Sequence, residues 1–132
     1  MSNQVFYNAE AVATPPGFSH AVRAGGLLFT SGQIPFDADG NVVGPGDMEA
    51  QARQVFRNLG AVLSTAGASF GDLVKLTFFV RDVTSLAAIR SVRDEFVDTA
   101  TPPASTLVEV SRLAAPDLLI EIEAVAVAPE PA

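Results

Sequence analysis

A long amphipathic segment in the middle of the chain constrains the fold more than any other feature. Its apolar side chains recur at steps of three and four residues, which places them on one face of an α-helix. They are Ala52, Val55, Phe56, Leu59, Val62, Leu63 and Ala66. Asp47 precedes this stripe as a helix cap, and Gly67 follows it where a glycine commonly ends a helix. Such a helix buries its apolar face against another element of secondary structure, so the rest of the chain has to supply a sheet or a second helix to pack against it.

The segments around this helix have strand patterns. Gly25-Gly26 separates two apolar-rich runs and is a good signal for a two-residue hairpin turn. Towards the end of the chain, residues 118–128 alternate between two faces, as expected for a strand with one buried face. The predicted strands are residues 19–24, 27–33, 74–80, 105–113 and 118–128, and a short strand near residues 5–7 would precede them.

A second helix is predicted between the third and fourth of these strands. Asp82 or Thr84 can cap its start, and it must end by Thr101, because Pro102-Pro103 disfavours helical geometry in the residue before it. The order β-β-α-β-α-β-β predicts a single α+β domain over residues 1–132, with two helices on one face of a mixed sheet. The other face would expose apolar side chains, so the pattern predicts association between copies of the chain. The residues expected on that face are Phe79, Leu107, Val125 and Val127, or their neighbours.

Charge and composition exclude several functions. Fifteen acidic residues against eight basic ones leave a net charge of −7, which argues against binding to nucleic acid. The 132 residues include no cysteine and one histidine, His20, so neither a metal site nor a catalytic triad is expected. No apolar run approaches the ~20 residues that span a bilayer. No basic segment followed by an apolar run opens the chain, so the sequence predicts a soluble cytoplasmic protein.

Four segments together resemble the RidA family of reactive-intermediate deaminases, also called the YjgF family. They are Thr30–Pro35 (TSGQIP), Gln51–Leu59 (QARQVFRNL), Pro103–Leu113 (PASTLVEVSRL) and Ile120–Val127 (IEIEAVAV). The similarity runs from Phe18 to Val127. It implies a chorismate-mutase-like fold and a homotrimer with its sites in clefts between subunits. It also implies hydrolysis of 2-imino and 2-enamino acids to 2-oxo acids and ammonia, with no metal and no cofactor.

This chain departs from the family pattern at the residue that binds the substrate carboxylate. Archetypal members read P-x-R-S in the third segment, and the arginine position is Ser105 here. Losing a charged hydrogen-bond partner typically costs ~1.5–3 kcal/mol. Phe18 replaces a tyrosine that lines the cleft. Arg90 stands on the second helix where relatives often carry a polar residue; it either meets an anion in the cleft, or is a solvated residue or a partner of Asp94.

Other positions retain the family pattern. Glu121 matches a carboxylate thought to orient the attacking water, and burial in an apolar cleft would raise its pKa. Glu123 shares its strand face, so the two also fit a solvated edge pair. Ser31 and Gly32 match a turn that borders the site, although a glycine there also fits a simple requirement of the strand end. The predicted substrate-binding residues are Phe18, Ser31, Gly32, Arg90, Ser105, Thr106 and Leu107, with Glu121 as the catalytic residue.

The sequence therefore leads to two main functional hypotheses. The first is an imine or enamine deaminase, a hydrolase that acts on a substrate other than the common 2-imino acids. Its turnover of the common 2-imino acids, such as 2-iminopropanoate, would be weak or absent. The second is a trimeric protein that binds a small metabolite, such as a carboxylate, without turnover. Ribonuclease activity, an old label on some relatives, is disfavoured by the acidic balance and the single histidine.

Overall fold

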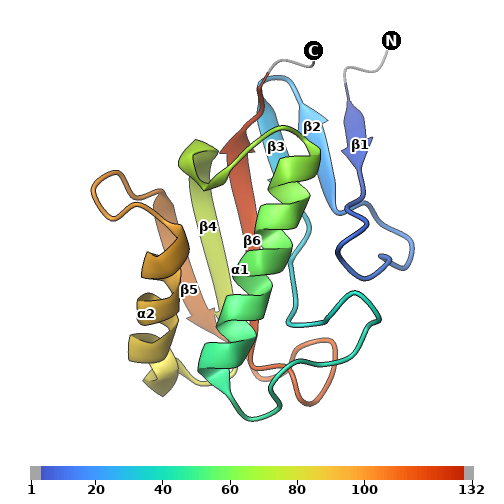
Figure 1. Cartoon of the computed structure of the whole chain (residues 1–132). Coiled ribbons are helices and arrows are strands. Elements are labelled where there is room, and N and C mark those ends of the chain that lie inside the picture. Colours follow the sequence, from blue (N-terminus) through green and yellow to red (C-terminus); the bar gives the residue numbers. More distant parts are fainter. Residues whose placement is uncertain (1–3, 130–132) are drawn as a thin grey trace.

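One six-stranded sheet carries both long helices on a single face, as the computed structural model shows for residues 4–129 (Figure 1). The helices are α1 (Met48–Thr65) and α2 (Leu86–Phe96). The strands are β1 (Val5–Tyr7), β2 (Ala21–Ala24), β3 (Leu27–Thr30), β4 (Leu73–Val80), β5 (Ala104–Glu109) and β6 (Ile120–Val127). Their order across the sheet is β1-β2-β3-β6-β4-β5. Only β4 and β5 run parallel, joined across α2, so the predicted mixed α+β fold is confirmed.

The predicted helix over the apolar stripe is α1, and both of its expected ends are present. The Asp47 carboxylate accepts a hydrogen bond of 3.0 Å from the Ala50 N–H, which caps the first turn. Gly67 follows the last turn with φ of +76°, a left-handed conformation that glycine adopts without steric cost. At the outer surface, Arg53 joins α1 to α2 through Glu95, with N–O distances of 3.0 and 2.6 Å.

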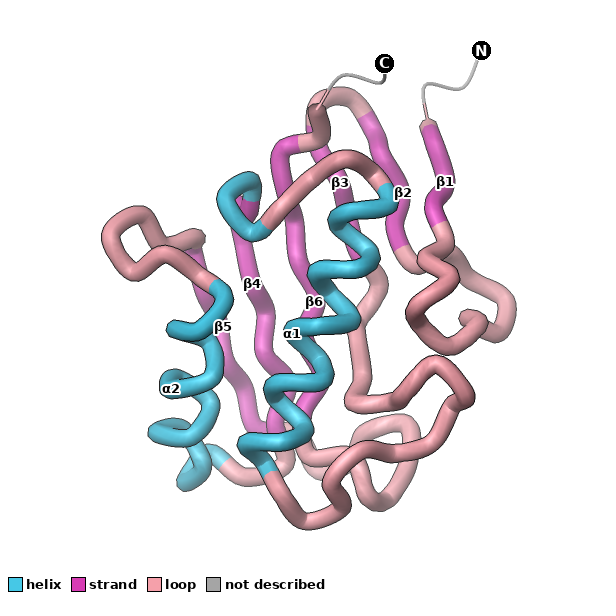
Figure 2. The backbone as a smooth tube through the Cα atoms, viewed as in Figure 1, coloured by secondary structure: helices cyan, strands magenta, loops and turns pink. Residues whose placement is uncertain are grey.

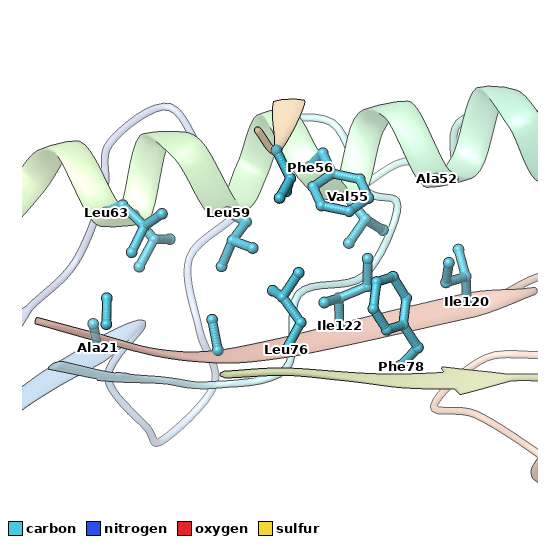
Figure 3. Close-up of a cluster of buried hydrophobic side chains, with 14 of the residues drawn as sticks. Ala21, Ala52, Val55, Phe56, Leu59, Leu63, Leu76, Phe78, Ile120 and Ile122 are labelled. Carbon is cyan, nitrogen blue, oxygen red and sulfur yellow. The ribbon is translucent and has the colours of Figure 1, made fainter. Parts of the chain in front are cut away.

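The core lies between α1 and the central strands β4 and β6. Figure 3 shows Val55, Phe56 and Leu59 of the helix facing Leu76, Phe78 and Ile122 of the sheet. The Phe56 ring is fully buried and meets three other rings, with centroids 5.2 to 6.3 Å apart. The alternation predicted for residues 118–128 is confirmed, because Ile120, Ile122, Ala124 and Ala126 are all buried.

Strand β4 differs from the predicted alternation at its start. Alternation along residues 74–80 would place Val74 on one face with Leu76, Phe78 and Val80. The last three are buried, yet Val74 is 43% exposed. The register against β6 shifts between Leu73 and Lys75, which marks a bulge or irregularity in the ladder. Leu73 and Lys75 pair with consecutive residues of β6, so Val74 between them is the extra residue and is left out of the alternation.

The face of the sheet away from the helices is uncovered in the single chain. The register places Phe29 and Val125 side by side on this open face, and Phe79 between Glu121 and Val108. Leu107 was expected here, but it pairs with Phe78 and packs against the core on the helix side. Its neighbour Val108 takes the open face instead and is 40% exposed.

The remaining segments are connections of varied length (Figure 2). The Asp82 carboxylate accepts from the Thr84 N–H at 2.9 Å and caps the short 3-10 turn Val83–Ser85 that leads into α2. The strand predicted over residues 105–113 is shorter, since β5 ends at Glu109. Among the described residues, no helix has the length and apolar character that crossing a membrane requires.

Candidate functional site

Glu121 and Gly32 come together where the chain leaves β3 and crosses beside β6. Gln33 exchanges two backbone hydrogen bonds with Ile122, of 2.8 and 3.1 Å, and this bridge fixes the segment against the strand. The Glu121 carboxyl then lies directly over Gly32. A Cβ at position 32 would stand 2.7 Å from the carboxyl carbon, closer than real side chains come. Glycine at this position is therefore what lets the carboxyl lie against the backbone.

Ser31 supports this turn rather than presenting its hydroxyl to a ligand. Its hydroxyl donates to the Ser19 carbonyl at 2.6 Å, and its N–H donates to the His20 carbonyl at 2.8 Å. Ser31 thus anchors the segment that carries Gly32. Gly32, one of the residues predicted to border the site, is in contact with Glu121.

The environment of Glu121 changes its acidity. Burial raises the pKa of the Glu121 carboxyl above its usual value, and the negative charge of Glu123 on the same face raises it further. The direction agrees with the expectation from sequence. A carboxyl whose pKa is shifted towards neutrality transfers protons more readily at physiological pH.

Phe18 lies at the rim of an apolar cavity that Gly32 also lines. The cavity has a volume of about 310 Å³ and separates the loop that follows β1 from the segment that follows β3. The Phe18 ring is 52% exposed. Two predicted site residues, Phe18 and Gly32, thus line one cavity, and Glu121 lies against it through Gly32.

A second group of predicted residues lies at the β5 edge of the sheet. Ser105 pairs with Leu76 and Leu107 with Phe78, so both side chains point to the helix side. Thr106 points to the open face, where its hydroxyl accepts a 2.6 Å hydrogen bond from the Lys75 ammonium. The three neighbours therefore do not form one binding surface in a single chain.

The arginine beside Ser105 is Arg93, a residue that the sequence comparison does not single out. Arg93, Thr99 and Ser105 line a cavity of about 250 Å³ beneath the end of α2. Arg90 is exposed one turn earlier and does not line this cavity. The expected partner of Arg90, Asp94, accepts instead from Arg93 at 3.0 and 2.8 Å. The spacing along α2 could have suggested Arg93 as a residue of this cavity, but only if the position of Ser105 relative to α2 had been known.

The two groups of residues cannot meet within one chain. Glu121 points to the open face, whereas Ser105 and Leu107 point to the helix face. Strand β4 also separates β6 from β5, which sets the two groups about 10 Å apart across the sheet. A single site that uses both groups requires a second copy of the chain.

His20 has a structural role that sequence reasoning missed. Its Nδ1 accepts from the Ala9 N–H at 3.0 Å, so the ring proton sits on Nε2, which lies 3.0 Å from the Ala13 carbonyl and donates to it. The ring is buried and fixes the loop between β1 and β2. Within residues 4–129, no group of three or more histidine or acidic side chains is placed to hold a metal ion.

Comparison with known proteins gives consistent matches over almost the whole chain. Residues 8–128 match the family model Endoribonuclease L-PSP. A RutC family protein of Synechocystis is 42% identical over 98% of this chain and 99% of its own. A protein of Escherichia coli K12 named 2-iminobutanoate/2-iminopropanoate deaminase is 42% identical over 91% of this chain and 92% of its own. The crystal structure of the yeast protein YEO7 superposes with a TM-score of 0.90 at 29% identity, covering 96% of this chain and all of that one.

Proposed function

The chain belongs to the Endoribonuclease L-PSP family, the YjgF/RidA family, and from this premise we propose that it is a deaminase that hydrolyses an imine or enamine. The family model takes its name from a nuclease. Relatives that are 42% identical to this chain over 91% of its length are named deaminases, and they favour deamination. The observation that carries the proposal is the Glu121 carboxyl, which lies over Gly32 with its pKa raised by burial.

The proposed reaction needs one group that moves protons. The ionised Glu121 carboxylate accepts a proton from water as the water oxygen bonds to the imine carbon. The carboxylic acid so formed returns the proton to the nitrogen, which gives the carbinolamine. The Glu121 carboxylate then takes the hydroxyl proton of the carbinolamine and passes it to the amine nitrogen, so that the C=O bond forms, the C–N bond breaks and ammonia leaves. The balance is R₂C=NH + H₂O → R₂C=O + NH₃. A group that both accepts and returns a proton works best with a pKa near the operating pH, and burial raises the pKa of Glu121 in this direction.

We further propose that the substrate differs from the common 2-imino acids. Ser105 stands where the family resemblance places the arginine that binds the carboxylate. A hydroxyl donates a hydrogen bond but supplies no positive charge. Arg93 lines the same cavity, but two of its hydrogen bonds already go to Asp94. This same difference supports the second candidate, a protein that binds a metabolite in these cavities without converting it.

The proposed assembly is a homotrimer with its sites between copies. The open face carries exposed apolar residues that a neighbour would cover, among them Leu27, Phe29, Val108 and Val127. The opposite directions of Glu121 and Ser105 support a site built from two chains. Light scattering combined with size-exclusion chromatography gives the number of copies directly.

The activity is tested with imines generated in solution, the 2-imino acids by an amino acid oxidase and the imines without a 2-carboxylate by an amine oxidase. Ammonia and carbonyl product are followed for a panel of 2-imino acids and of imines and enamines without a 2-carboxylate. We expect turnover of at least one panel member, loss of it in Glu121→Gln, and little change in Glu10→Gln, which removes an exposed carboxylate elsewhere. Thermal stabilisation by a carboxylate metabolite without any turnover would support the binding protein instead.

A mixing experiment tests the shared site. Glu121→Gln and Leu107→Arg each disable one of the two residue groups, so each variant alone is expected to be inactive. Unfolded together and refolded as a random trimer, they restore about one site in four, where an intact Glu121 meets an intact β5 of the next chain. If the mixture stays inactive while trimers form, the site does not combine these groups from two copies.

A further inference from the structure

The cavity beside Gly32 has the size and lining of a site for an apolar group. Its walls come from the loop after β1 and the segment after β3, which lie next to each other beside the sheet (Figure 1). The apolar lining residues include Val12, Pro15, Phe18, Ile34, Phe36 and Ala114. Its volume of about 310 Å³ lies at the lower end of the ~300–1,000 Å³ typical of ligand pockets. An engineered apolar cavity of ~150 Å³ in another protein is large enough to bind benzene.

Three polar side chains in the wall, Asn58, His20 and Gln33, are hydrogen-bonded to other parts of the protein. The Asn58 amide donates to the carbonyls of Ile34 and Phe36 at 3.0 and 2.9 Å, and its oxygen accepts from Gln54 at 2.8 Å. Both His20 nitrogens are engaged with the backbone of Ala9 and Ala13. A polar ligand group would find few free partners here and would lose its hydration, which disfavours its entry. An apolar group has no such penalty.

Gly32 connects this cavity to the reactive carboxyl. It lines the cavity, and it is also the residue over which the Glu121 carboxyl lies. A group seated in the cavity therefore has its attachment point close to Glu121. Because Gly32 lacks a side chain, nothing at this position separates the two.

We propose that this cavity receives the apolar substituent on the imine carbon, so that the enzyme prefers imines with a benzyl or branched aliphatic group over those with a methyl group. This inference rests on the proposed deaminase function and names its substrate class. The cavity holds the substituent while the C=N group faces the Glu121 carboxyl. Each additional methylene in a fitted apolar pocket typically changes kcat/KM by ~10-fold or more.

Binding to the cavity is tested without any reaction. Toluene and indole are added to ¹⁵N-labelled protein, and we expect shifts of the amide signals of Gly32 and Gln33 with saturation. Ala114→Phe places a ring at the cavity wall on an exposed turn and is expected to abolish these shifts. Ala38→Phe is the matched control, because Ala38 is exposed on the loop after β3 but does not line the cavity. Absence of saturable shifts in the wild type, or equal loss in both variants, overturns the cavity as an apolar site.

Turnover is compared for a benzyl-substituted and a methyl-substituted imine that both lack a 2-carboxylate. We expect a kcat/KM at least 10-fold higher for the benzyl compound, reduced to near equality in Ala114→Phe and kept in Ala38→Phe. Equal wild-type values for the two compounds overturn the substrate preference even if toluene binds. If neither imine reacts while toluene still saturates the cavity, the deaminase function fails and the preference fails with it, but the apolar site stands.

Discussion

Replacing Gly32 by alanine tests the central contact of the proposed site. A Cβ added at Gly32 would overlap Oε2 of the Glu121 carboxyl, its nearest neighbour, and ordinary contact begins at 3.4 Å, so the carboxyl must move by about 1 Å or more. The backbone at Gly32 does not have a positive φ, and alanine fits its conformation. The substitution therefore displaces the carboxyl without straining the chain. The free energy of unfolding should change by less than about 1 kcal/mol.

The expected loss of activity follows from this displacement. A misplacement of about 1 Å at a reacting group can reduce the rate ~100-fold. A shift of about 1 Å or more should thus lower kcat by ~100-fold, which corresponds to about 2.7 kcal/mol in the activation free energy. The assay is release of ammonia from the best imine of the panel. Gly26→Ala is the control, since a Cβ there meets nothing within 4 Å and the residue also lacks a positive φ.

A second measurement on Gly32→Ala does not depend on activity. Displacement from its half-buried position over Gly32 exposes the Glu121 carboxyl to water, so its pKa should fall towards the ordinary value for glutamate of ~4.3. Carboxyl ¹³C NMR of the labelled protein follows this titration directly. An unchanged kcat together with an unchanged titration of Glu121 would refute the reasoning, because the contact would then have no bearing on the carboxyl.

Three further predictions concern charge and packing. Because burial raises the folded pKa of Glu121, its ionised form opposes folding: Glu121→Gln should raise Tm at pH 7 but not at pH 3, below the unfolded value of ~4.3 where both states carry the proton. Ser105→Arg should raise kcat/KM for 2-iminopropanoate by ~10- to 100-fold, through a charged contact with the carboxylate, while Thr106→Arg, whose side chain takes the opposite face, should not. Phe56→Ala should lower the free energy of unfolding by about 3–5 kcal/mol in a urea titration, since the ring is fully buried among three others; a loss below 1 kcal/mol would contradict this packing.

The fold follows closely from local patterns in the sequence. The Asp47 cap, the Gly67 end and the Gly25-Gly26 turn are chemical signals that act within a few residues, and all three are present in the structure. The errors occur where pairing between distant strands decides. The register shift in β4 takes Val74 out of the core, and the pairing of β5 with β4 turns Leu107 inward. A run of alternating residues does not show which of its two sets of side chains the pairing with a neighbouring strand will turn towards the core.

The candidate site was only partly predictable for the same reason. Sequence matching selects Glu121 and Gly32, and their direct contact agrees with that selection. It cannot place Arg93 beside Ser105, because this neighbourhood depends on how α2 packs over the parallel pair β4 and β5. Nor can it identify His20 as the residue that holds the β1–β2 loop, since both of its partners are backbone atoms that any sequence supplies.

The charges near Glu121 give a physical reason for the proposed choice of substrate. Glu121 and Glu123 project from the same face of β6, and the repulsion between them contributes to the raised pKa of Glu121. On that face the Lys75 ammonium is held by Thr106. A substrate carboxylate that entered beside these acids would meet like charge, whereas a protonated imine would be attracted. The same ionised carboxylate that disfavours an anion therefore stabilises the iminium form, which is the form that water attacks most readily.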